Sequence, residues 1–443
     1  MSVFISIITV LLVLGILSAA HELGHFFVAK LMKVKAYEVS IFVGPALFKW
    51  RKNNVDYSIR CIPIGAYVRF NEVDNEGKPI ESDDPTLLLN QPRWKRLIIA
   101  LAGPFVNLLL GILIFIVFFC ATGYTSLDLG ATDPGTQLYE QHYEVGDTIV
   151  ALNGKRVFTY DELYISFNFI NDVDPVELTL KSKETGEKYN ITLTPVIKRQ
   201  TMLGINRLKD LDPDTGGWVI AANWNEKSDL LQEGDILVAI DGRPMDDNIS
   251  EYVSSKSEND TVAIEYIRDG QKMTGEVPLF AYDHTNYRGI ILQEHSVRSV
   301  GEFFGAVGNA VKMPVSILRL TGLVISNAIG GKVEIYNVIS GPVGVVNVVD
   351  TVVANENVNT GLKVSTLVML AGMISVALTI SNMLPLPGLD GAQVIILIVE
   401  MVIGRKLPQK AENAITIIGF FVLLGLVLLA FASDIAKIVF EGW

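Results

Sequence analysis

The sequence predicts a polytopic α-helical membrane protein with four transmembrane helices, a membrane re-entrant β-loop and two extracytoplasmic β-rich domains. Three observations indicate this fold class: four long apolar segments, a strand pattern that follows the first of them, and a motif that occurs twice in the polar middle of the chain. Half of the 443 residues are hydrophobic, which excludes a disordered chain and fits a membrane protein with a sizeable soluble part. The two cysteines are too few for a disulfide framework.

The four apolar segments cover residues 3–29, 97–121, 364–384 and 414–432. An apolar stretch of about 18 or more residues can cross a bilayer as a helix. The connection after the first segment holds all the basic residues of the first 122, and the connection before the last segment holds Arg405, Lys406 and Lys410. Cytoplasmic connections carry the excess of Lys and Arg, so we expect both termini and the long acidic middle of the chain to be extracytoplasmic. Nothing in this acidic chain, with a net charge of −12, indicates nucleic-acid binding.

Residues 38–70, directly after the first apolar segment, show the composition of β-strands. We expect strands at 39–43, 46–50, 55–61 and 64–70, with the polar residues 51–54 forming a turn. Non-helical backbone at membrane depth is tolerated only where it is buried in protein or lines a cavity. Two interpretations stay open on these residues alone: a sheet that folds back into the membrane, and an ordinary cytoplasmic hairpin.

The acidic middle of the chain contains an internal repeat. Residues 145–155 align with residues 233–243, and each copy has a Gly-Asp turn, an apolar strand and an Asn-Gly or Asp-Gly hairpin turn. The pattern resembles the corresponding part of PDZ domains, which bind a peptide as an added strand. We therefore expect PDZ-like domains at 126–200 and 201–282, with a degenerate fold that binds no ligand as the alternative.

Residues 300–330 are moderately apolar but contain Lys312, Pro314 and Arg319, and they begin the segment 300–355 that we expect to lie on the membrane surface. Charge and proline in so short an apolar run argue against a span. An amphipathic helix pair on the outer membrane surface is the expectation.

The most informative motif, His21-Glu22-Leu23-Gly24-His25, lies at the end of the first apolar segment. On a helix His21 and His25 fall one turn apart on one face, so both imidazoles can bind one zinc ion, and Glu22 beside them can act as a general base. Polar groups inside a membrane are costly, and a metal ion supplies the partner they need. The alternative is a helix end whose polar side chains face water.

A third protein ligand is needed to complete a catalytic zinc site. The candidate is Asp390, which follows a segment with two prolines and a glycine that must break the helix before it. An acidic residue in a broken apolar helix is a functional candidate, although it could also cap the next helix.

The HExxH helix, the Asn-x-x-Pro-x-Pro-x-Leu-Asp-Gly element at 382–391 and the inserted repeats together resemble the site-2 protease family of intramembrane zinc metalloproteases, in its bacterial RseP-type branch. The resemblance covers essentially the whole chain. It implies one zinc ion held by His21, His25 and Asp390, Glu22 as general base, substrate contact by Asn382, and a re-entrant β-loop at 38–70. The segment 103–107 matches a further family element, although close helix packing explains it equally well.

The resemblance implies hydrolysis of peptide bonds in or near the transmembrane helix of single-pass membrane proteins, after their outer part has been trimmed. Anti-sigma-factor-like regulators and signal-peptide remnants are the expected substrates, and the bacterial plasma membrane is the expected location. Two rivals remain: a catalytically silent scaffold that recruits partners through its PDZ-like domains, and a metal transporter. The intact Glu22 argues against the scaffold, because a structural zinc site needs no base.

Overall fold

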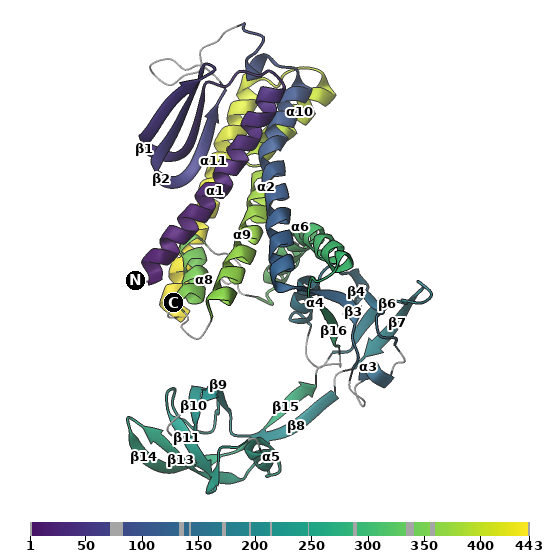
Figure 1. Ribbon diagram of the computed structural model, residues 1–443, viewed down its shortest axis with the longest axis vertical. Helices are drawn as coiled ribbons and strands as arrows, with labels where there is room; N and C mark the ends of the chain where they lie inside the picture. Colours follow the sequence, from purple (N-terminus) through teal and green to yellow (C-terminus); the bar gives the residue numbers. More distant parts are fainter. Residues whose placement is uncertain are drawn as a thin grey trace. The chain divides into compact units, whose positions relative to one another are not determined.

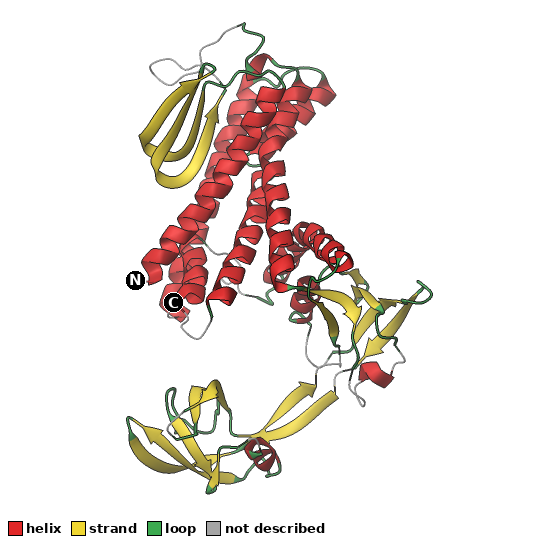
Figure 2. Cartoon of the chain, in the orientation of Figure 1, coloured by secondary structure: helices red, strands yellow, loops and turns green. Residues whose placement is uncertain are grey.

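A computed structural model describes residues 2–70, 83–132, 137–140, 143–170, 174–194, 196–212, 215–246, 248–286, 290–333, 341–354 and 359–441. The chain forms two compact units, which are described separately. A mostly helical unit contains residues 1–128, 155–169 and 292–443, and a β-rich unit contains residues 129–154 and 170–291. Figures 1 and 2 show the elements of each unit.

The long helices are α1 (Ser2–Leu31), α2 (Arg93–Thr122), α6 (Val300–Ile329), α8 (Pro342–Ala354), α9 (Thr360–Asn382), α10 (Asp390–Ile403) and α11 (Gln409–Glu441). The short helices are α3 (Gln137–Glu140), α4 (Tyr160–Phe167) and α5 (Ile249–Ser254), with a 3-10 turn at Leu88–Asn90. Among the described residues, α1, α2, α9 and α11 are long and apolar enough to cross a membrane. This result confirms the four expected spans.

α2 packs against α1 and α9 in the helical unit (Figure 1), and small residues let these helices approach closely. A Cβ atom on Gly24 of α1 would lie 2.8 Å from the carbonyl oxygen of Ala102 on α2. On the other side of α2, Ser375 of α9 donates a hydrogen bond to the carbonyl oxygen of Asn107 over 2.8 Å. These contacts hold α1, α2 and α9 close together, because a side chain at position 24 would overlap the main chain of α2.

The chain between α9 and α10 leaves helical geometry, as its two prolines predict. Gly388 has a φ of +92°, which favours glycine, and α10 then starts at Asp390. A Cβ atom on Gly391 would lie 2.3 Å from the carbonyl oxygen of Met383, so only glycine fits after Asp390. The break therefore places Asp390 at the first turn of a new helix that is packed closely against the end of α9.

Two long strands, β1 (Glu38–Lys52) and β2 (Val55–Arg69), follow α1. Each contains two of the four expected strands. The first part of β1 lies between the two ends of β2 and pairs with both. Val39, for example, pairs with Tyr57 near the start of β2 and with Val68 near its end. The sheet packs on α1 through a cluster that includes Phe26, and a Cβ atom on Gly15 would lie 2.6 Å from the carbonyl oxygen of Pro63. The β1–β2 sheet thus runs alongside α1 as far as the middle of that helix (Figure 1).

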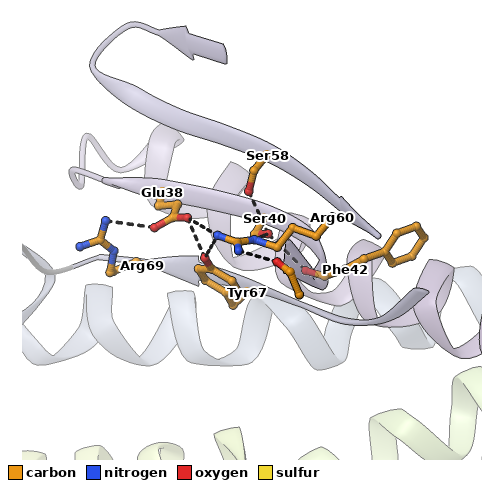
Figure 3. A network of polar contacts seen from close by, with 8 residues as sticks. Glu38, Ser40, Phe42, Ser58, Arg60, Tyr67 and Arg69 are labelled. Carbon is orange, nitrogen blue, oxygen red and sulfur yellow. Dashed lines mark hydrogen bonds and ion pairs between the residues drawn. The ribbon is translucent and has the colours of Figure 1, made fainter. Parts of the chain in front are cut away.

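A polar network stabilises this sheet from within (Figure 3). The Arg60 guanidinium donates to Ser40 Oγ over 2.8 Å, to the Gly44 carbonyl over 2.8 Å, and to Glu38 over 3.1 Å. Tyr67 donates to the same Glu38 carboxylate over 2.6 Å. Charged groups inside a sheet are stable only when their donors and acceptors are paired, and Arg60 meets this condition.

The β-rich unit and its flanks contain the remaining strands: β3 (Tyr124–Leu129), β4 (Thr148–Leu152), β5 (Lys155–Arg156), β6 (Val176–Lys181), β7 (Lys188–Leu193), β8 (Val196–Met202), β9 (Ile205–Leu211), β10 (Trp218–Asn223), β11 (Ile236–Ile240), β12 (Arg243–Pro244), β13 (Thr261–Arg268), β14 (Gln271–Pro278), β15 (Phe280–Asn286) and β16 (Leu292–His295). In both copies of the repeat the apolar strand of the motif pairs with the first strand of a hairpin. β4 pairs with β6 of the β6–β7 hairpin, and β11 pairs with β13 of the β13–β14 hairpin.

The two copies of the repeat are equivalent down to single hydrogen bonds. The Gly-Asp turn of the first copy bonds through Gly146 N–H to the Leu129 carbonyl, and that of the second copy through Gly234 N–H to the Ile220 carbonyl. The hairpin turns Asn153-Gly154 and Asp241-Gly242 have positive φ at both residues, as the turn type favoured by right-twisted strands requires. The internal repeat is therefore a structural repeat, while its likeness to PDZ domains stays a prediction.

One feature differs from the expectation. Residues 300–329 form one continuous helix, α6, rather than a helix pair, although Pro314 lies inside it. Ala310 and Met313 pack against Phe115 of α2, and this packing supports the helix through the proline. Residues 155–169 lie in the helical unit, where the buried Glu162 of α4 pairs with Arg319 of α6 over 2.5 Å.

Candidate metal centre

The two histidines of the first motif point to one place beside α1. His21 and His25 are both buried, each with 7% exposure, and they lie on a helix of mostly apolar residues. Their Nε2 atoms lie 3.1 Å apart. The helical spacing of four residues therefore produces the paired arrangement that the sequence predicts, and the side chains are shielded from solvent.

Asp390 joins this pair from the far end of the chain. Its Oδ2 atom lies 2.9 Å from His21 Nε2 and 3.4 Å from His25 Nε2. Among the described residues this is the one group of three or more His, Cys, Asp and Glu side chains whose atoms are close enough to hold a metal ion. His21, His25 and Asp390, called the metal centre below, are thus brought together as predicted.

The hydrogen bonds around the metal centre fit a cation. His25 Nδ1 lies 2.7 Å from the Ile99 carbonyl oxygen. A carbonyl only accepts, so Nδ1 carries a ring proton, and in the neutral ring this leaves the Nε2 lone pair free on the side of the Asp390 carboxylate. In this tautomer both the imidazole nitrogen and the carboxylate oxygen can bind a zinc ion placed between them.

The space for an ion depends on Gly103 of α2. A Cβ atom at this position would lie 2.3 Å from His25 Nε2 and 2.6 Å from His21 Nε2, against an ordinary contact of 3.4–4 Å. Any larger residue would push into the ligand atoms themselves. The donor set and the open space together fit the zinc ion that the sequence predicts.

Glu22 lies beside the metal centre and is partly buried. Its Oε2 atom accepts a hydrogen bond from the main-chain N–H of Val68 in β2 over 3.1 Å. The β1–β2 sheet therefore orients the carboxylate that the motif predicts as the general base.

The structure places two of the other three histidines in the fold. His295 stacks on Tyr124 with ring centres 4.9 Å apart, and its Nε2 lies 3.0 Å from Ser126 Oγ. His284 lies in β15, and His142 is outside the described residues. Asn382 is the last residue of α9, directly before the broken segment that leads to Asp390, and its substrate role stays a prediction.

Sequence reasoning did not assign two residues that the structure places at the metal centre. Gly103 makes room for the ligand atoms, and Asn107 lies with its Nδ2 atom 3.4 Å from His21 Nδ1. Both belong to the segment 103–107 whose role the sequence left open. The four-residue spacing of Ile99, Gly103 and Asn107 puts them on one face of α2, which is a signal that becomes meaningful once the neighbouring helix is known.

Comparison with known proteins identifies the family of the chain. The model of peptidase family M50 matches residues 9–426. A protein of Clostridium acetobutylicum named as a candidate zinc metalloprotease is 26% identical, with 98% of each chain covered. Proteins with the same kind of name from Thermotoga maritima and Neisseria meningitidis are each 26% identical, and the matches cover 96% or more of this chain.

The match to the family model extends over nearly the whole chain and includes both parts of the metal centre. It favours a protease over the scaffold and the metal transporter. The chain belongs to peptidase family M50, the site-2 proteases, and is a zinc metalloprotease of the membrane.

Proposed function

We propose that this protein is an intramembrane protease that hydrolyses peptide bonds in or near the transmembrane helix of single-pass membrane proteins. One observation carries the proposal: His21 and His25 lie within the apolar helix 3–31, which is long enough to span a bilayer, and Asp390 meets them there. A protease of water-soluble substrates has no need for ligands at this depth, because polar groups inside a bilayer are costly.

In the proposed mechanism His21, His25 and Asp390 hold the zinc ion. The ion supplies a Lewis acid for the scissile carbonyl and makes water a stronger acid. Glu22 takes up the proton of the attacking water and delivers it to the leaving nitrogen. The Val68 N–H holds Glu22 in place, so the base stays oriented before substrate enters.

The β1–β2 sheet is proposed as a membrane re-entrant β-loop that holds substrate. Several apolar side chains of the sheet are exposed, as expected for a surface in contact with lipid: Leu47 (61%), Phe48 (66%), Trp50 (47%) and Ile64 (48%). The last part of β2 directs a main-chain N–H toward Glu22 instead of toward another strand. An unwound substrate segment could pair along this edge and bring its peptide bond to the metal centre.

A proline at position 68 tests the role of this edge. Val68→Pro removes the N–H that orients Glu22, so we expect cleavage to fall by at least about tenfold while zinc content stays at the wild-type level. Unchanged turnover would refute the role of this edge in catalysis.

We further propose that the β-rich region is extracytoplasmic, that the protein lies in the bacterial plasma membrane, and that the region's two PDZ-like domains exclude substrates whose outer part is intact. The charge distribution of the connections supports the orientation, and the bacterial sources of the relatives support the location. Anti-sigma-factor-like regulators and signal-peptide remnants are the proposed substrates, and Asn382 is proposed to contact them at the entrance to the broken segment.

A deletion tests whether the PDZ-like region excludes substrates whose outer part is intact. Met202 of β8 and Phe280 of β15 are paired neighbours. Replacing residues 203–279 by an Asn-Gly turn therefore closes the β8–β15 ladder as a hairpin. This variant lacks the second PDZ-like domain, and we expect it to cleave a substrate whose outer domain is still attached. Continued strict dependence on trimming would contradict a role of the second domain in excluding such substrates.

The central test is Glu22→Gln in protein reconstituted into liposomes with a model single-pass substrate. The variant should keep its zinc and lose cleavage by about 10²–10⁴-fold, because the amide cannot accept the proton. Glu276→Gln on the exposed face of β14 is the matched control and should cleave like wild type. Cleavage by Glu22→Gln at the wild-type rate would overturn the proposed mechanism.

A further inference from the structure

Asn107 is a fully buried polar residue on α2, with 0% exposure. Its Nδ2 atom lies 3.4 Å from His21 Nδ1, and its Oδ1 atom has no hydrogen-bond partner among the described residues. A buried amide oxygen without a partner costs about 1–3 kcal/mol, so its presence calls for a reason.

The reason lies in the proton on His21. A histidine that binds a metal through Nε2 carries its ring proton on Nδ1 and needs an acceptor there. His21 Nε2 is the atom that faces Asp390, so Nδ1 is the atom left for this bond. Rotating the Asn107 amide by half a turn exchanges its nitrogen and oxygen with almost no change in shape. The amide oxygen then faces His21 Nδ1 and can accept, while the amide nitrogen takes the place where the oxygen had no partner.

His25 shows the same arrangement with a main-chain acceptor. Its Nδ1 atom lies 2.7 Å from the carbonyl oxygen of Ile99, also on α2. Ile99 and Asn107 stand two helical turns apart on one face of α2, with Gly103 between them. One helix therefore carries an acceptor for each histidine and, between the acceptors, the space for the ion.

Resting on the zinc site proposed above, we propose that Asn107 is a positioning residue whose side-chain oxygen accepts the Nδ1 proton of His21 and fixes the ring for zinc binding. The present 3.4 Å separation is a few tenths of an ångström longer than an ordinary hydrogen bond of about 2.7–3.2 Å. A small turn of the imidazole closes the gap. Asn107 acts through His21 and does not touch substrate.

The main chain at Asn107 is held independently of its amide. Ser375 of α9 donates to the Asn107 carbonyl oxygen over 2.8 Å and is itself fully buried. Ser375→Ala therefore disturbs helix packing at the same level of α2 without removing the acceptor for His21, which makes it the matched control.

The test measures zinc affinity of the purified full-length protein by competition with a chelator, together with the visible spectrum of the cobalt-substituted protein. Asn107→Leu removes the acceptor and should weaken zinc binding by about 10–100-fold and change the cobalt spectrum. Asn107→Asp keeps an acceptor and should bind zinc within about threefold of wild type, as should Ser375→Ala.

Three results would overturn the inference: wild-type zinc affinity in Asn107→Leu, equal losses in the Leu and Asp variants, or an equal loss in Ser375→Ala. The last would show that packing alone sets the affinity. A wild-type protein that binds no zinc at all would instead contradict the proposed function, so the two failures are distinguishable.

Discussion

The substitution Gly103→Ala tests the geometry of the metal centre with a single added methyl group. The new Cβ would lie 2.3 Å from His25 Nε2 and 2.6 Å from His21 Nε2, where 3.4 Å is the near limit of ordinary contact. Both imidazoles, or α2 itself, must move by about 1 Å to relieve the overlap. A zinc–nitrogen bond measures about 2.0–2.1 Å and tolerates a change of only about 0.2 Å, so a shift of this size disrupts coordination.

The expected magnitude follows from packing energetics. Forcing an extra methyl group into a closely packed site costs about 1–3 kcal/mol. If most of this strain is released by moving the histidines, zinc affinity falls by about 10–100-fold, since each 1.4 kcal/mol is a factor of ten. Cleavage at limiting zinc should fall in parallel.

The assay is zinc content and chelator competition on purified protein, followed by cleavage at limiting and at saturating zinc. Gly111→Ala is the matched control, because it lies two turns further along α2, where a Cβ would lie 2.9 Å from a Val376 methyl group, away from the ligands. It should cost a similar amount of stability and keep its zinc. Wild-type zinc affinity in Gly103→Ala would refute the reasoning.

Three further predictions concern the sheet, the β-rich unit and the ion. Arg60→Met leaves Glu38 without one of its donors and should cost about 1–3 kcal/mol of stability, reducing cleavage but not zinc content; unchanged thermal unfolding and turnover would contradict this. Burial of Asp235 opposes its ionisation, but hydrogen bonds from Arg268 and the Gln232 N–H outweigh it and hold the pKa of Asp235 below its ordinary value of about 3.9. The stabilisation from the Asp235 carboxylate is therefore complete above its pKa in the unfolded chain and is lost as the pH falls through its lower pKa in the folded protein. Amide hydrogen exchange of residues 236–240, corrected for the intrinsic rate, should accelerate in acid, and it should accelerate less in Asp235→Asn. Removing zinc with a chelator should lower the melting temperature of wild type, since a ligand that binds only the folded state stabilises it, and should leave that of His21→Ala unchanged; an equal drop in both would argue against this site.

Local physics made much of the fold predictable. The four spans depend on the length and apolar character of single segments, and the hairpin turns depend on Asn-Gly and Asp-Gly pairs that tolerate positive φ. The pairing of His21 with His25 follows from helical spacing alone. The helix pair expected around Pro314 was wrong. The packing of α6 on α2 keeps the helix continuous where the local sequence favours a break.

The sequence by itself determined which groups can bind a metal, because a histidine pair one turn apart and an aspartate after a broken helix are local features. Only the tertiary structure decided that Asp390 meets His21, that Gly103 leaves room for the ion, and that Asn107 and Val68 lie beside His21 and Glu22. These contacts join residues distant along the chain. They depend on how closely α1, α2, α10 and the β1–β2 sheet approach one another, and that distance is set by packing rather than by any one segment.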